Sequence, residues 1–101
     1  MEKRKPHYRL ADMKLAFSDP DQLNRTATSK QGADDLEMDD TDVVAVIQAL
    51  TNADFDKSMT SYYDHKVWQD VYRPRVDDRT IYLKFTVDAQ QAYLLISFKE
   101  E

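Results

Sequence analysis

The chain has 101 residues, no cysteine and a formal net charge of −5. That length accommodates a single hydrophobic core, so we expect one domain over residues 1–101. The lack of cysteine excludes a disulfide framework and a thiolate metal site. No stretch approaches the roughly 20 consecutive apolar residues of a membrane span, and no signal-peptide pattern follows the basic N-terminus, so we expect a cytoplasmic protein without a membrane partner.

The negative charge is concentrated in one segment. Residues 31–56 contain eight acidic residues and no basic one, whereas residues 1–30 carry a net +3 and residues 57–101 contain seven residues of each sign. The acidic run lacks the glycine and glutamate spacing of a calcium-binding EF-hand, so we interpret it as a solvated face. Phosphate binding depends mainly on Lys and Arg, so the other segments could still bind a nucleic acid.

Two segments have the periodicity of amphipathic helices. Apolar side chains recur three and four positions apart in residues 8–18 and again in residues 42–50, which predicts a helix in each. Pro20 follows the first segment and would end it. The cap-type and acidic residues 40–42 favour the N-terminal end of the second.

The segments around these helices have weaker signals. Residues 23–28 predict a short strand. Ser29 could cap a brief helix over residues 29–38, although the glycine within it lowers the helix propensity. Thr51 followed three positions later by Asp54 resembles a capping box, so we expect one further helical turn there.

The C-terminal half is predicted to be β-structure. Residues 58–63 and 67–73 are rich in β-branched and aromatic side chains and predict two strands joined by a turn at residues 64–66. Alternation puts Trp68, Asp70 and Tyr72 on one side of the second strand, and the pattern leaves open which side is buried. Together with a final hairpin, this order of elements predicts an α+β fold, with N-terminal helices packed on a curved antiparallel sheet.

The final hairpin, residues 80–99, can be registered from its apolar pattern. A four-residue loop at 88–91 puts Tyr82 opposite Ser97 and makes one face of the hairpin entirely apolar. The other face then carries four polar side chains: Tyr82, Lys84, Ser97 and Lys99.

Six polar side chains in or next to these strands could take part in catalysis, and composition alone does not single them out. Cleaving RNA without a metal requires groups that move protons and cations that stabilise the phosphorane. On an exposed sheet face, such side chains are more often solvated or paired across strands. The six candidates are Lys57, Gln69, Arg73, Tyr82, Lys84 and Lys99.

Other chemistries have little support in the sequence. His65 falls in a predicted polar turn, where we expect it to bond a neighbour, and His7 lies near the terminus. Two dispersed histidines and no cysteine do not suggest a zinc site, and there is no glycine-rich phosphate loop. We therefore expect neither a metal nor a cofactor.

Several aromatic side chains have two possible roles. Aromatics on a sheet can stack on the bases of single-stranded nucleic acid, but they can equally pack in the core. For Trp68 we favour the core. The same two roles remain open for Tyr62, Tyr63 and Tyr72.

Four segments resemble the MqsR family of type II toxins in order and spacing: MEKRKPHYRL, DFDKSMTSYYDHKVWQDVYRPR, IYLKFTV and ISFKEE. The resemblance implies a RelE-like ribonuclease fold. It also implies an endoribonuclease that cuts single-stranded mRNA without a metal or the ribosome, preferentially at GC-containing sites such as GCU. A cognate, MqsA-like antitoxin is the implied protein partner.

The resemblance also implies roles for individual residues. The lysine, glutamine and tyrosine of the family's active site match Lys57, Gln69 and Tyr82, and Lys99 is a further match. Lys57 and Lys99 would then stabilise phosphate charge, Tyr82 would orient the 2′-hydroxyl or carry its proton, and Gln69 would hold the substrate. Arg73 and Lys84 are expected to bind RNA. The alternative is a non-catalytic module that binds a regulatory protein through the acidic segment and a sheet edge.

Overall fold

The computed structural model describes residues 1–101. An antiparallel sheet forms the centre of the molecule. Neighbouring strands follow the order β1–β2–β3–β5, with β6 on the other side of β5 and β4 also paired to β5. The strands are β1 (Glu2–Lys3), β2 (Phe55–Thr60), β3 (Trp68–Tyr72), β4 (Arg75–Val76), β5 (Arg79–Val87) and β6 (Tyr93–Glu100).

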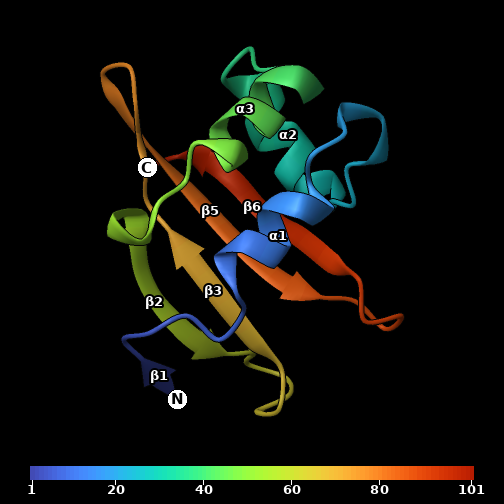
Figure 1. Ribbon diagram of the computed structural model, residues 1–101, viewed down its shortest axis with the longest axis vertical. Helices are drawn as coiled ribbons and strands as arrows, with labels where there is room; N and C mark the ends of the chain where they lie inside the picture. Colours follow the sequence, from blue (N-terminus) through green and yellow to red (C-terminus); the bar gives the residue numbers. More distant parts are fainter.

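Three α-helices pack on one side of this sheet (Figure 1). They are α1 (Leu10–Ala16), α2 (Ala27–Asp35) and α3 (Asp40–Gln48), and single 3-10 turns occur at Pro20–Gln22 and Asn52–Asp54. The predicted α+β fold with N-terminal helices on an antiparallel sheet is therefore confirmed. No helix has the length and apolar character needed to cross a membrane.

The helix starts follow local capping chemistry. Asp39 and Asp42 form a reciprocal capping box at the start of α3, each carboxylate accepting the backbone amide of the other residue. Thr26 caps α2 by accepting the amide of Ser29 at 3.1 Å, so the prediction of Ser29 as the cap was wrong by one turn. The turn predicted from Thr51 and Asp54 is present.

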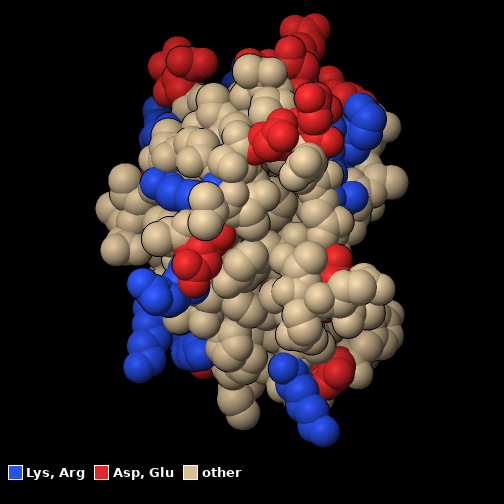
Figure 2. Space-filling model, turned by 45° about the vertical axis from the view of Figure 1, so that its right-hand side comes forward, with Lys and Arg blue, Asp and Glu red and all other residues tan.

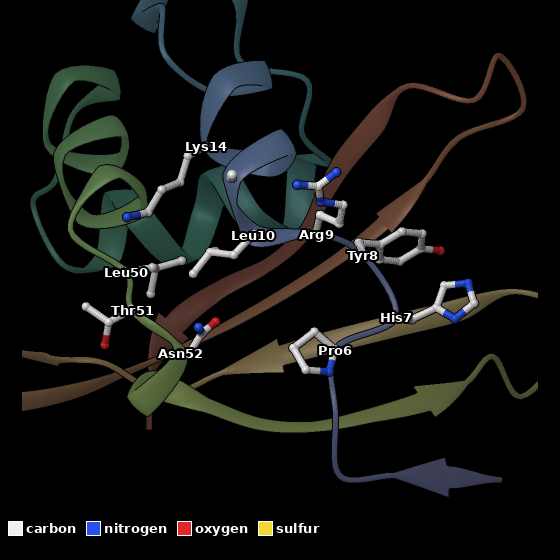
Figure 3. Close-up of a pocket in the computed structure, with 10 residues that line it drawn as sticks. Pro6, His7, Tyr8, Arg9, Leu10, Lys14, Leu50, Thr51 and Asn52 are labelled. Atoms are coloured by element: carbon white, nitrogen blue, oxygen red, sulfur yellow. The ribbon is translucent and has the colours of Figure 1, made fainter.

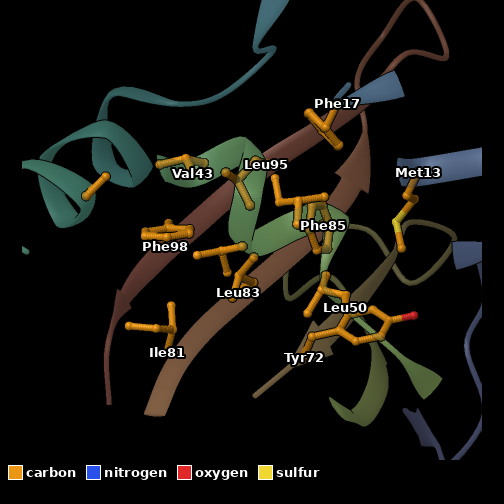
Figure 4. Packing of buried hydrophobic residues seen from close by; sticks show 13 residues of the cluster. Met13, Phe17, Val43, Leu50, Tyr72, Ile81, Leu83, Phe85, Leu95 and Phe98 are labelled. Atoms are coloured by element: carbon orange, nitrogen blue, oxygen red, sulfur yellow. The ribbon is translucent and has the colours of Figure 1, made fainter. Parts of the chain in front are cut away.

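The core lies between the helices and the sheet (Figure 4). The inward residues of β5 alternate along the strand, as a half-buried strand requires. Thirteen buried side chains form the cluster: Met13, Phe17, Ala33, Val43, Val46, Ile47, Leu50, Tyr72, Ile81, Leu83, Phe85, Leu95 and Phe98.

The register predicted for the final hairpin was wrong. Tyr82 pairs with Lys99 rather than Ser97, and a bulge shifts the register between Lys84 and Phe85. The loop is also one residue longer than predicted, because the Asp88 carboxylate accepts the amides of Gln90 and Ala92 and holds it in shape. Near Tyr82 the shift is two residues along β6, which leaves the same side chains on each face.

The segment predicted as a strand at 23–28 does not form one. Only Arg25 makes an isolated parallel bridge to Leu95, with the amide of Leu95 donating to the Asn24 carbonyl at 3.0 Å. This short pairing covers part of the outer edge of β6. Strands β1 and β4 were not predicted, since each is only two residues long.

The buried side of β3 is the side that faces the N-terminal segment. Asp70 is fully buried and accepts the backbone amides of His7 at 3.0 Å and Tyr8 at 2.9 Å. The ring of His7 stacks on Trp68 at 5.3 Å between centroids. These contacts hold the crossing segment before α1 against the sheet, and they settle which face of β3 the helices cover.

Candidate active site on the open sheet face

All six candidate side chains project from the sheet face opposite the helices. Directly opposed residues of an antiparallel pair share a face. Lys57 pairs with Val71, Val71 pairs with Lys84, and Lys84 pairs with Ser97, so these four residues form one row across β2, β3, β5 and β6. The remaining candidates lie on either side of this row.

Tyr82 lies within a group of three cationic side chains. The Lys99 and Lys84 ammonium nitrogens lie 5.3 Å and 5.6 Å from the centroid of its ring. The guanidinium carbon of Arg73 lies 5.8 Å from the same centroid. Each distance falls within the range of a cation–π interaction. The structure thus brings four of the six candidates together at one place.

Lys57 lies further across the sheet. One strand, β3, separates it from Lys84, which corresponds to about 10 Å at the usual strand spacing. Its ammonium nitrogen lies 3.2 Å from a carboxylate oxygen of Glu2, on the edge strand β1. Lys57 thus pairs with the edge strand β1 and lies apart from the group around Tyr82.

Gln69 lies toward the other end of this face. It is directly opposite Met59 on β2 and two residues along β3 from Val71, which points to the same side. Four residues of strand separate it from Arg73, or about 13 Å. Gln69 is therefore placed to contact a part of a substrate different from the part that lies at Tyr82.

Two carboxylates hold the Arg73 side chain in position. Its Nε lies 3.5 Å from Asp56, and its Nη2 lies 2.7 Å from Glu101. Neither partner could be predicted from the sequence, because both contacts depend on which strands become neighbours. The pairs fix the guanidinium beside the Tyr82 ring and neutralise part of its charge.

The tyrosines on the helical side are poor proton carriers. Burial, with the nearby Asp70 charge, raises the pKa of Tyr72 above that of a free phenol. Burial also raises the pKa of Tyr8 and of Tyr93. These phenols remain protonated at neutral pH.

Neither histidine lies in this group. His7 is on the helical side, where burial and the neighbouring Lys3 lower its pKa below the usual value. His65 is exposed in the loop between β2 and β3, in the turn predicted at 64–66. No group of three or more His, Asp or Glu side chains is arranged to hold a metal ion.

The candidate residues line an open surface. The largest recess, about 640 Å³, lies elsewhere, between the N-terminal segment with α1 and residues 50–52 (Figure 3). None of the six candidates lines this or any other recess of the molecule. An open cationic face suits an extended polymer better than a small enclosed ligand.

The charges are unevenly distributed over the surface. On the side shown in Figure 2, acidic side chains gather at the top, which is the end where α2 and α3 lie in Figure 1. Several Lys and Arg side chains project from the lower half. Segment 31–56 carries the acidic residues of both helices, and its Asp56 reaches the neighbourhood of Tyr82 through an ion pair with Arg73.

Comparison with known proteins gives two matches. The sequence model of a family described as "Motility quorum-sensing regulator, toxin of MqsA" matches residues 5–100. The "mRNA interferase toxin MqsR" of Escherichia coli (strain K12) is 45% identical over 101 residues, which covers the full length of both chains.

Proposed function

The chain belongs to the MqsR family of toxins, and from this premise we propose that residues 1–101 form one catalytic domain that cuts mRNA without a metal ion. As an mRNA interferase it is an endoribonuclease. We further propose that it cuts independently of the ribosome at GC-containing sites such as GCU. Because the substrate is mRNA, the cytoplasm is the compartment in which it would act.

The observation that carries the proposal is the Tyr82 phenol among Arg73, Lys84 and Lys99 on an open face. A phosphodiester gains negative charge as it reaches the phosphorane. Fixed cations around the reacting atoms stabilise that charge without reorganising during the reaction. The geometry supports a site for a polyanion whose charge increases in the transition state.

The proposed reaction is an internal transfer. The 2′-oxygen loses its proton and forms a bond to phosphorus, while the bond from phosphorus to the 5′-oxygen breaks and that oxygen gains a proton. The products are a 2′,3′-cyclic phosphate and a 5′-hydroxyl. Tyr82 would orient the 2′-hydroxyl or carry its proton, and Lys99 and Lys57 would stabilise the phosphate charge.

The other candidates would position the RNA. Arg73 and Lys84 lie beside Tyr82 and can bind phosphates next to the one that is cut. Gln69, further along β3, offers an amide that can both donate and accept hydrogen bonds, and it would hold the substrate there.

A cognate, MqsA-like antitoxin is the proposed protein partner, in line with the description "toxin of MqsA" of the matched family. The second candidate function is binding of such a partner without catalysis, which the acidic surface of α2 and α3 would serve. The double variant Lys57→Ala/Tyr82→Phe separates the two functions. It should lose cleavage and still bind the partner if the chain is an enzyme.

The deciding experiment incubates the purified chain in EDTA with a defined single-stranded RNA that contains one GCU, alongside an RNA in which that site is changed. We expect one cut at the GC-containing site, with a 2′,3′-cyclic phosphate on one product and a 5′-hydroxyl on the other. Cleavage that is lost in EDTA and restored by magnesium would overturn the metal-free proposal.

A further inference from the structure

Two tyrosines stand almost fully exposed in the loop that joins β2 to β3. Tyr62 is 88% exposed and Tyr63 is 93% exposed, and they are the only large aromatic side chains of the chain so exposed. Single exposed apolar residues are ordinary, but two adjacent aromatic side chains that stay almost fully exposed after folding suggest a binding role. The proposed reaction leaves these side chains without a function.

Local hydrogen bonds hold the loop in shape. The Ser61 amide donates to the Val67 carbonyl at 2.7 Å and closes the loop at its base. Within it, the Asp64 carboxylate accepts the Lys66 amide at 2.9 Å, and the Ser61 hydroxyl accepts the Tyr63 amide at 3.3 Å. The exposed rings are therefore presented by an organised turn, which reduces the entropy lost when a ligand binds.

The two rings face each other edge to face. Their centroids are 5.1 Å apart and their planes meet at 84°. In this arrangement the edge of one ring covers at most one face of the other, so each ring keeps an open face for a planar ligand. An unpaired nucleobase is such a ligand, and its stacking on an aromatic tolerates any base.

The loop is continuous with the candidate active site. A recess of about 560 Å³ runs from Tyr62 and His65 to Met59 on β2. Met59 is directly opposite Gln69, which lies on the same face as the cationic group around Tyr82. An RNA strand bound along this face would thus pass from Tyr82, past Gln69, to the exposed rings.

We propose that Tyr62 and Tyr63 form a stacking platform for an unpaired base of the RNA substrate, at a nucleotide that flanks the cut. The inference rests on the proposed function, since it places a second nucleotide of the same RNA substrate on the loop. Gln69 is about 13 Å from Arg73 and the loop lies beyond it. The platform therefore binds a neighbouring nucleotide and leaves the reacting atoms to Tyr82 and the lysines.

The test uses the full chain and a single-stranded RNA made uncleavable by 2′-deoxy substitution at its GC-containing site. Binding is followed by fluorescence anisotropy for Tyr62→Ala, Tyr63→Ala and the corresponding Phe variants. Loss of one stacked base should weaken binding by roughly fivefold to a hundredfold in the Ala variants, whereas the Phe variants, which keep the ring, should bind as the unsubstituted chain does. The matched control is Leu15→Ala, since Leu15 is 75% exposed on α1 and should have no effect.

Two further readouts distinguish stacking from a structural role. On cleavable RNA, the Ala variants should raise KM and leave kcat nearly unchanged. The fluorescent base 2-aminopurine, moved along the flanking nucleotides, should be quenched at one of them by the unsubstituted chain and by neither Ala variant.

The outcomes separate the two proposals. If the unsubstituted chain cuts RNA but the Ala variants bind it equally well, the platform does not exist. If those variants weaken only the binding of an antitoxin, the loop is a protein-docking surface and the inference is overturned. If no RNA is cut by the unsubstituted chain, the proposed function fails, and the anisotropy series still decides whether the loop binds single-stranded RNA.

Discussion

The hydroxyl of Tyr82 is the atom on which the proposed chemistry depends most. Replacing Tyr82 with Phe keeps the ring and its three cationic neighbours and removes only the hydroxyl, the group proposed to orient the 2′-hydroxyl or carry its proton. Proton-transfer groups typically contribute 10²- to 10⁴-fold to a rate, so we expect kcat to fall by about 100-fold or more. Single-turnover cleavage of the GCU-containing RNA measures this.

The control for this variant is Tyr63→Phe, which removes a hydroxyl from a fully exposed ring and should leave kcat unchanged. Thermal unfolding should show little change in stability for either variant. A Tyr82→Phe enzyme that cleaves as fast as the unsubstituted chain would remove the phenol from the mechanism.

Asp70 is expected to matter for the stability of the fold. Its buried carboxylate accepts the amides of His7 and Tyr8, and substitution by Ala would leave these two donors without a partner. Hydrogen bonds to charged groups are worth more than neutral ones, so we expect Asp70→Ala to lower the free energy of unfolding by about 2–4 kcal/mol. Urea denaturation measures the change.

For comparison, Asp64→Ala removes an exposed carboxylate that accepts a single amide within a turn. That variant should lose less than about 1 kcal/mol. Equal losses for the two variants would mean that Asp70 does not hold the N-terminal segment to the sheet.

Contacts between residues on separate strands limited what could be predicted for single residues from the sequence. The side of β5 that carries Tyr82 and Lys84 could be predicted, because alternation along a strand is local. The partners of Arg73 could not, since Asp56 and Glu101 approach it only through the pairing of separate strands. The roles of all six candidates remain predictions.

At the scale of elements, the close approach of α2 to β6 depends on one glycine. A Cβ atom at Gly32 would overlap the carbonyl oxygen of Phe98 and lie 3.3 Å from the Cβ of Lys99. The overlap is with backbone, so relieving it requires the helix or the strand to move. This contact supports the part of β6 that carries Lys99.

We expect Gly32→Ala to destabilise the protein by about 1–3 kcal/mol, as overpacking does, although alanine favours a helix by roughly 1 kcal/mol over glycine. Urea denaturation checks the sign. On the same helix, Lys30→Ala changes an exposed position and should shift stability by no more than about 0.5 kcal/mol. A more stable Gly32→Ala protein would mean that α2 and β6 separate at little cost.

The elements that the sequence predicted best are those with local signals. Helix α3 has its cap and its apolar stripe within a dozen residues, so its position could be predicted closely. The final hairpin could not be registered, because its alignment depends on the Asp88 side chain in the loop and on a bulge beside Lys84. Strand β1 pairs with residues 58–59, far along the chain, and two residues leave no pattern of their own.

At the scale of the whole molecule, basic side chains gather on the open sheet face and acidic ones on α2 and α3. If RNA binds the basic face, its affinity should fall as the salt concentration rises. Each lysine that contacts a phosphate adds about one unit to the slope of log affinity against log salt concentration. Lys99→Ala should therefore reduce that slope by about one. A titration of RNA binding at several salt concentrations measures it.

Acidic residues of α2 that form no ion pair with the cationic group around Tyr82 should matter little. Reversing Asp34 and Asp35 to lysine on α2 should leave the cleavage rate nearly unchanged at physiological salt, where screening acts over about 8 Å. Asp39 and Asp40 are less suitable for this test, because Asp39 caps α3 and Asp40 pairs with the mostly buried Arg25, whereas Asp34 pairs only with the exposed Lys30. A tenfold loss of rate in the reversed variant would mean that the RNA crosses the α2 surface.

The docking of the N-terminal segment on Asp70 also governs the order in which the protein can fold. The first nine residues leave the ribosome early, but their partners on β2 and β3 lie more than 50 residues later in the chain. Contacts of such long sequence separation form late and slow the folding of a domain. A newly made chain therefore cannot complete its sheet, or the candidate active site upon it, until most of it has been synthesised. This delays the appearance of active toxin relative to its translation.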